Sequence, residues 1–268
     1  TGYMSRLAVV VHRLFRLMGL SGRAILPMML GLGCDTMATV STRILESRKE
    51  KIIVTFLLAL GVPCSAQLTV ILAFFAGLPR WSILLWALVV CTVMIVAGAL
   101  SALVLSGPSA SLIIEIPPLR LPSVSNIFAK TLARLEWYLT EAVPLFMGAT
   151  AILFFLAKVG ALPRIEALME PLTVGWLGLP PETAGAFLMG FLRRDYGAAG
   201  LFHQFETGAL DTIAATVALI TITLFVPCVA NFLMIGKEHG WKTAFATALI
   251  IFPLAFFVGG IVNLALRR

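Results

Sequence analysis

The sequence predicts an all-α protein that crosses a membrane several times. Hydrophobic residues fill 60% of its 268 positions and charged residues only 12%, whereas soluble domains carry roughly 25% charged residues. The net charge of +7 comes from residues that gather between long apolar runs, which favours a lipid bilayer over nucleic acid as the partner surface. Since a span needs about 20 residues, the chain has room for about six to eight such elements.

A short internal repeat indicates that the chain has two related halves. The stretch LGVPCSAQ at 60–67 returns as LFVPCVAN at 224–231. In each copy a cysteine follows the proline, and an amide side chain follows three residues later on the same helical face. Interrupted apolar segments at corresponding positions of two halves are typical of a transport site near the middle of the membrane.

The prolines of this repeat interrupt helical hydrogen bonding. Proline has no N–H group, so Pro63 leaves the carbonyl of Ala59 without its helical partner, and Pro227 does the same to Thr223. A free carbonyl inside a membrane needs a polar partner. We therefore expect a group other than lipid to meet the Ala59 oxygen.

The first half is read as a series of helical elements. We expect an amphipathic helix in the membrane interface, a short broken or re-entrant element, a charged turn facing the cytoplasm, a span broken at Pro63 and an unbroken span. These elements occupy 5–18, 25–40, 42–51, 52–76 and 81–105, respectively.

The second half begins after a proline-rich boundary, 106–125. We expect a second interfacial helix, a span, a surface segment, a broken element that mirrors the first, a span broken at Pro227 and a closing span. The interfacial helix carries Phe128, Leu132, Leu135 and Leu139 on one face. The other elements lie at 142–162, 162–181, 183–201, 213–235 and 244–266. The predicted division is a first half at 1–105, a linker with an interfacial helix at 106–141 and a second half at 142–268.

Three of the four cysteines stand at interruptions of apolar runs, and we read all four as thiols. Cys64 and Cys228 follow prolines, and Cys34 follows two glycines and precedes Asp35. A carboxylate there would be costly in contact with lipid. Cys91 lies in an unbroken apolar run and is most simply a packed residue.

Other polar residues leave alternatives open. Asp195 follows Arg193 and Arg194 beside glycines, and these charges either neutralise one another or take part in gating. Glu141 is expected at the edge of a span. The three histidines, His12, His203 and His239, are expected at the surface.

The chain resembles the membrane region of the FeoB family of ferrous iron transporters. The residues that carry the resemblance are Gly31-Leu-Gly-Cys34, Ala38, Thr42-Arg43-Ile-Leu-Glu46, Cys64-Ser-Ala and Val226-Pro227-Cys228-Val-Ala, together with Thr1-Gly-Tyr3-Met-Ser-Arg6 and Gly19-Leu-Ser-Gly22-Arg23.

This resemblance implies two gate-type halves around a core cysteine region that passes Fe²⁺ into the cytoplasm, in the cytoplasmic (inner) membrane of a cell. Members of the family carry a GTP-binding domain on the same polypeptide. No GxxxxGK[ST] phosphate loop occurs here, so we expect no GTP site and no enzymatic activity in this chain. We also expect it to be part of a longer protein, with a homo-oligomer as a possible assembly.

Fe²⁺ accepts thiolate, thioether and oxygen ligands. The proposed metal ligands are Cys34, Asp35, Met37, Cys64 and Cys228. The proposed pathway residues are Cys34, Asp35, Cys64, Gln67, Asp195, Cys228 and Asn231; Asp195 lies where the family often has Glu after a basic residue. A transport site must release its ion, so we expect partial ligation.

Two other functions remain open at this point. A gate-type carrier of a nucleoside-like or other organic solute would use the helix breaks to expose backbone, with cysteines that only pack. An intramembrane thiol enzyme would exchange electrons between Cys34, Cys64 and Cys228, but no CxxC pair supports it.

Overall fold

The computed structural model describes residues 3–105, 123–137, 139–140, 143–158, 160–225 and 227–267, and all regular secondary structure in these ranges is helical. The predicted all-α class is therefore confirmed. In chain order the elements are α1 (Tyr3–Leu17), the 3₁₀ helix η1 (Gly22–Ala24), α2 (Ile25–Gly31), α3 (Asp35–Ser41), the 3₁₀ helix η2 (Thr42–Ile44), α4 (Arg48–Gly61), α5 (Ser65–Gly77), α6 (Arg80–Val104), α7 (Val124–Trp137), α8 (Val143–Lys158), α9 (Ala161–Glu170), the π-helix η4 (Pro171–Trp176), α10 (Thr183–Leu192), α11 (Arg194–Glu206), α12 (Thr212–Leu224), α13 (Val229–His239) and α14 (Trp241–Arg267).

Four helical segments of the described chain are long and apolar enough to cross a membrane. Two are the unbroken helices α6 and α14, and the other two are the joined pairs α4–α5 and α12–α13. The chain is therefore a multi-pass membrane protein, with two of its crossings interrupted as predicted. Within the interrupted crossings, every residue of 53–61 in α4 and of 214–224 in α12 is buried, so these half-helices form the centre of the fold.

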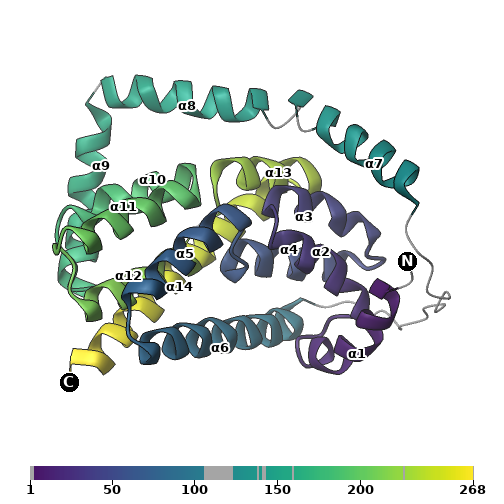
Figure 1. Cartoon of the computed structure of the whole chain (residues 1–268), viewed down its shortest axis with the longest axis horizontal. Helices are drawn as coiled ribbons and strands as arrows, with labels where there is room; N and C mark the ends of the chain where they lie inside the picture. Colours follow the sequence, from purple (N-terminus) through teal and green to yellow (C-terminus); the bar gives the residue numbers. More distant parts are fainter. Residues whose placement is uncertain are drawn as a thin grey trace.

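The region between the halves differs from the prediction. The span expected at 142–162 is the 16-residue helix α8, whose length of about 24 Å falls short of the roughly 30 Å hydrocarbon layer. Together with α7 it runs along the outside of the helical body (Figure 1). The expected surface segment at 162–181 is wrong in part, because Leu177 and Leu179 are buried. The boundary at 106–122 and Glu141 lie outside the described residues.

The order of elements in the first half returns in the second. A broken element (α2 and α3), a broken span (α4 and α5) and a long helix (α6) correspond to α10 and α11, α12 and α13, and α14. The backbone at the breaks agrees as well. Cys34 and Arg193 have φ/ψ of −157°/119° and −143°/118°, while Cys64 and Cys228 have −70°/164° and −60°/155°. The predicted internal repeat is thus present in the backbone.

The two halves pack crosswise. Helix α3 of the first half contacts α13 of the second, and α5 contacts α11; likewise α4 contacts α14, and α12 contacts α6. Each contact has a counterpart in which the roles of the halves are exchanged. Such exchange is what a pseudo-two-fold relation between repeats produces, and it brings the four helix breaks to the middle of the molecule (Figure 1).

A close approach of α10 and α11 makes Gly197 sensitive to substitution. A Cβ atom at this position would lie 2.5 Å from the Gly190 Cα atom and 2.7 Å from the Ala186 oxygen, both backbone atoms. We expect Gly197→Ala to lower the free energy of unfolding by about 1–3 kcal/mol, because the helices must separate. Reversible unfolding in mixed micelles measures this. Gly200→Ala in the same helix is the control, since its nearest neighbour, the Ala186 Cβ atom, lies 3.4 Å away; equal effects would contradict the prediction.

Candidate functional site

The site begins with the two proline breaks. Helix α4 ends at Gly61 and α5 begins at Ser65, while α12 ends at Leu224 and α13 begins at Val229. The backbone is extended at Val62 and Cys64 in the first break and at Phe225 in the second, so the last carbonyls of α4 and α12 have no helical partner. These oxygens need hydrogen-bond donors inside the fold.

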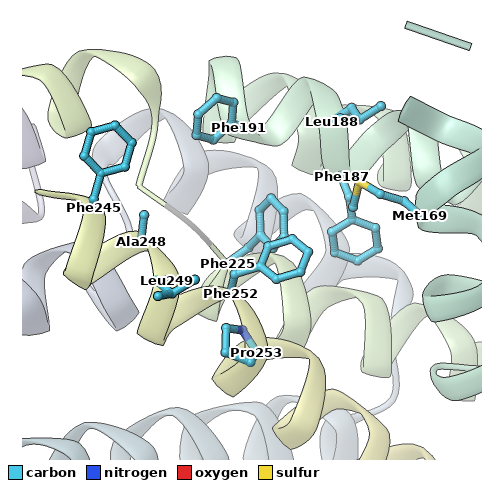
Figure 2. A pocket seen from close by; sticks show the side chains of 10 residues that line it. All are labelled: Met169, Phe187, Leu188, Phe191, Phe225, Phe245, Ala248, Leu249, Phe252 and Pro253. Carbon is cyan, nitrogen blue, oxygen red and sulfur yellow. The ribbon is translucent and has the colours of Figure 1, made fainter. Parts of the chain in front are cut away.

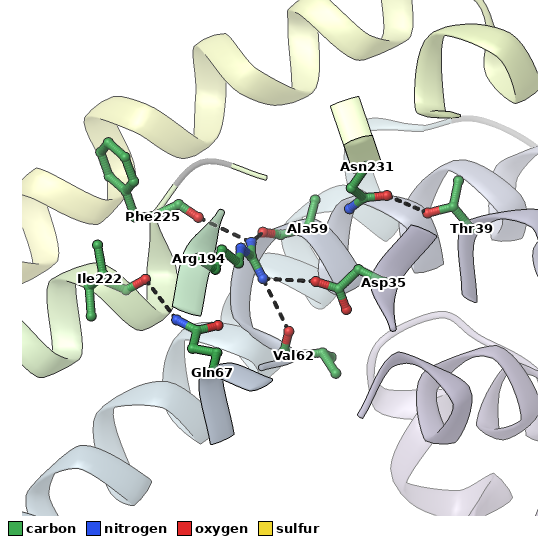
Figure 3. A network of polar contacts seen from close by, with 9 residues as sticks. All are labelled: Asp35, Thr39, Ala59, Val62, Gln67, Arg194, Ile222, Phe225 and Asn231. Atoms are coloured by element: carbon green, nitrogen blue, oxygen red, sulfur yellow. Dashed lines mark hydrogen bonds and ion pairs between the residues drawn. The ribbon is translucent and has the colours of Figure 1, made fainter. Parts of the chain in front are cut away.

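The side chain of Arg194 meets them. It is 3% exposed; its Nη1 atom donates to the Val62 oxygen (3.2 Å) and to Asp35 Oδ2 (2.9 Å), and its Nη2 atom donates to the Phe225 oxygen (3.1 Å) and to the Ala59 oxygen (Figure 3). The expectation that a group other than lipid meets the Ala59 oxygen is confirmed. The guanidinium joins the ends of α4 and α12 to the start of α3.

The electrostatics of this position favour a cation. The carboxyl ends of α4 and α12 direct the negative ends of two helix dipoles to one place, and the buried Asp35 side chain, 3% exposed, is the acidic partner there. Arg194 supplies the neutralising charge although it is the first residue of α11, where the helix dipole disfavours a cation. The attraction of Arg194 to Asp35 and to the carbonyl oxygens therefore outweighs its repulsion by the dipole of α11.

The ion pair joins equivalent positions of the repeat. Asp35 is the first residue of α3 after the break at Cys34, and Arg194 is the first residue of α11 after the break at Arg193. The two halves thus place opposite charges at matching sites. Sequence reasoning grouped Arg194 with its neighbours and missed this role; the signal was its place in the element that mirrors 25–40.

The amides of the repeat are both fully buried. Gln67 donates through Nε2 to the Ile222 oxygen (3.2 Å), and Asn231 accepts through Oδ1 from the Thr39 hydroxyl (2.8 Å) (Figure 3). Each amide therefore links one half to the other. Gln67 Oε1 is left buried without a hydrogen-bond partner, and so is Asp35 Oδ1.

The cysteines are free thiols at the breaks. Cys34, Cys64 and Cys228 are each partly buried, and Cys91 is exposed. The breaks of Cys34 and Cys64 are joined directly, because Ser65 donates from its backbone nitrogen (3.3 Å) and its hydroxyl (2.9 Å) to the Gly33 oxygen. Cys228 lies within electrostatic range of Cys64, Asp35 and Arg194.

Of the remaining predicted residues, Asp195 has a partner of its own and Met37 lies on α3. Asp195 accepts hydrogen bonds from Arg193, with an Nη2 to Oδ2 distance of 2.6 Å, and Met37 is partly buried on α3. The described residues contain no group of three or more His, Cys, Asp or Glu side chains arranged to hold a metal. The full ligand set proposed from sequence therefore stays a prediction.

Two of the histidines have partners that sequence reasoning missed. His239 is partly buried, and its Nε2 atom lies 2.9 Å from Thr55 Oγ1 and 3.3 Å from Thr42 Oγ1, so its predicted surface position is wrong. His12 accepts a hydrogen bond at Nδ1 from the Gly22 nitrogen. His203 is exposed, as predicted.

An apolar pocket of about 580 Å³ lies beside the break between α12 and α13 (Figure 2). Its lining residues are Met169, Phe187, Leu188, Phe191, Phe225, Phe245, Ala248, Leu249, Phe252 and Pro253. The Phe225 ring packs against Phe187 and Phe252, while the Phe225 carbonyl accepts from Arg194. The pocket wall and the central ion pair thus share one residue.

Comparison with known families and proteins agrees with this architecture. The family model described as "Nucleoside recognition" (Gate) matches residues 1–78 and 139–242, and the model described as "Ferrous iron transport protein B C terminus" matches residues 83–134. No solved structure matches the chain.

Several curated relatives carry the name Fe(2+) transporter FeoB. The protein of Staphylococcus aureus (strain MSSA476) is 28% identical over 95% of this chain and 42% of its own length, and that of Methanocaldococcus jannaschii is 24% identical over 98% and 44%. The protein of Legionella pneumophila (strain Lens) is 30% identical over 57% of this chain and 21% of its own length. The chain thus spans less than half the length of these relatives, and it belongs to the Gate nucleoside-recognition family, in the form found in the membrane region of FeoB.

Proposed function

We propose that this chain is the permease region of a ferrous iron transporter and passes Fe²⁺ into the cytoplasm between the helix breaks. The observation that carries the proposal is that the carboxyl ends of α4 and α12 and the Asp35 side chain meet at buried helix breaks in the centre of a multi-pass fold. Cys34, Cys64 and Cys228 each directly precede a half-helix at these breaks. Buried polar groups inside a membrane protein mark ion pathways. The printed name of these relatives, Fe(2+) transporter FeoB, supports Fe²⁺ as the ion.

The proposed pathway keeps the residues predicted from sequence. Oxygen ligands come from Asp35 and Gln67, each of which has a buried oxygen without a hydrogen-bond partner. Thiolate ligands come from the three cysteines at the breaks, and Met37 offers a thioether. Asp195 and Asn231 lie next to these groups along the chain breaks and complete the polar lining. The ion is the cargo, so ligation is partial and exchangeable.

The similarity to the FeoB relatives also supports a proposal for the membrane and the partners of this chain. We place the chain in the cytoplasmic membrane, with a GTP-binding domain on the same polypeptide driving the permease and with lipid around α6 and α14. The sequence of the chain itself holds no phosphate loop, so GTP binding belongs to that other domain. Assembly as a homo-oligomer is part of this proposal.

Anaerobic flux into proteoliposomes tests the function. Vesicles that hold the purified chain and an iron-quenched dye are expected to take up Fe²⁺ at least tenfold faster than protein-free vesicles. The second candidate, transport of a nucleoside-like solute, is favoured by the description of the matching family model. Uptake of a radiolabelled nucleoside without Fe²⁺ flux would replace the iron permease by this carrier.

A further inference from the structure

The groups around Arg194 are oxygen atoms of the kinds that coordinate metal cations in other proteins. It is the one Lys or Arg among the described residues whose side chain is fully enclosed. Its partners are the Asp35 carboxylate and the backbone oxygens of Ala59, Val62 and Phe225. Carboxylate and carbonyl oxygens are the groups that replace the hydration shell of an ion in a membrane pathway.

The guanidinium does not use the full hydrogen-bonding capacity of the site. Arg194 Nε is buried without a partner, and so are the acceptor atoms Asp35 Oδ1 and Gln67 Oε1. With Asn231 Nδ2, which is also buried without a partner, two donors and two acceptors stay unpaired within the same polar centre (Figure 3). Unpaired buried groups favour exchange of this arrangement for one that satisfies them.

We infer that Arg194 is a tethered cation that holds the place of Fe²⁺ in the closed pathway and must leave before the ion can bind. This inference rests on the proposed function. Two positive groups cannot share the site, because like charges repel strongly where water is excluded. Arg194 begins α11 directly after the break at Arg193, so a shift of this half-helix carries the guanidinium away from the carbonyls.

The same arrangement sets what an incoming ion must do. It has to replace the attraction between Arg194 and Asp35 and supply the positive charge that the site then lacks.

Fe²⁺ binding to charge variants of the purified chain tests the inference. Under anaerobic conditions, Arg194→Gln is expected to bind Fe²⁺ at least tenfold more tightly than the wild type, because the competing charge is gone. Arg194→Lys keeps a tethered cation and is expected to stay within about threefold of the wild type. Arg267→Gln, which removes an exposed cation that donates to the Gly178 oxygen, is the control and is expected to leave the affinity unchanged.

A purely structural role for Arg194 gives the opposite result, since damage to the site weakens Fe²⁺ binding in Arg194→Gln. Equal or weaker binding by Arg194→Gln, or equal gains in Arg194→Gln and Arg194→Lys, would overturn the inference. Fe²⁺ flux through the wild-type chain is measured in parallel. If the wild type carries Fe²⁺ but Arg194→Gln binds the ion no more tightly, only the role of Arg194 as a tethered cation is rejected. If the wild type neither carries nor binds Fe²⁺, the iron permease is rejected as well.

A second variant keeps the test independent of folding yield. Arg194→Ala leaves a space of the shape of the lost side chain, and millimolar guanidinium is expected to raise its melting temperature and to compete with Fe²⁺. Competition by guanidinium in Arg194→Ala but not in the wild type supports the inference. Fe²⁺ affinity that is insensitive to guanidinium in Arg194→Ala would contradict it.

Discussion

Replacing Asp35 with Asn is expected to lower the free energy of unfolding by about 3–5 kcal/mol, because it leaves the Arg194 guanidinium buried without its counter-ion. The two side chains are 4% and 2% exposed, with an Nη1 to Oδ2 distance of 2.9 Å. Asn keeps the shape of Asp, so the change reports on charge and not on packing. Reversible unfolding of the purified chain in mixed micelles measures the difference.

Two further variants show whether the loss comes from the ion pair. Asp35→Asn/Arg194→Gln removes both charges and is expected to recover more than half of the lost stability, since no charge remains buried without a partner. Asp195→Asn is the control, because its partner Arg193 is 43% exposed and such pairs contribute about 0–1 kcal/mol. If Asp35→Asn costs no more than Asp195→Asn, the central ion pair does not stabilise the fold as described.

The triple variant Cys34→Ser, Cys64→Ser, Cys228→Ser is expected to weaken Fe²⁺ binding by at least about 100-fold, or about 2.7 kcal/mol. Serine nearly preserves the size of each side chain but replaces a thiolate by a hydroxyl, a poorer ligand for Fe²⁺. Anaerobic titration of the reduced protein measures the affinity.

Cys91→Ser is the matched control for this prediction. Cys91 is exposed on α6, away from the helix breaks, and its replacement is expected to change the affinity by less than about twofold, or 0.4 kcal/mol. Equal Fe²⁺ binding by the wild type and the triple variant would remove the thiols from the ligand set. The carrier of an organic solute would then be the better account of the helix breaks.

The parts of the fold that could be predicted from sequence depend on local chemistry. Pro63 and Pro227 have no backbone donor, so the breaks and the need for a partner at the Ala59 oxygen follow from the residues themselves. The same holds for the repeat, since proline, cysteine and amide recur in register. The span expected at 142–162 shows the limit of composition, because an apolar run does not fix the length of the helix it forms.

The partner of Arg194 depends on tertiary structure and could not be read from the chain. Asp35 lies 159 residues away from it, and nothing in the local sequence distinguishes Arg194 from Arg193. The fold separates them: Arg193 pairs with nearby Asp195, whereas Arg194 enters the centre. His239 was misplaced for a similar reason, because its partners Thr42 and Thr55 come from the other half. Long-range polar pairs of this kind are chosen by packing, not by local pattern.

X-ray absorption at the iron edge tests most directly whether the ion binds at the breaks. The chain is loaded anaerobically with one equivalent of Fe²⁺ and compared with the triple cysteine variant. The account predicts a mixed shell of sulfur and oxygen neighbours in the wild type, with the sulfur contribution lost in the variant and kept in Cys91→Ser. A shell of oxygen and nitrogen alone in the wild type would contradict ligation by Cys34, Cys64 and Cys228.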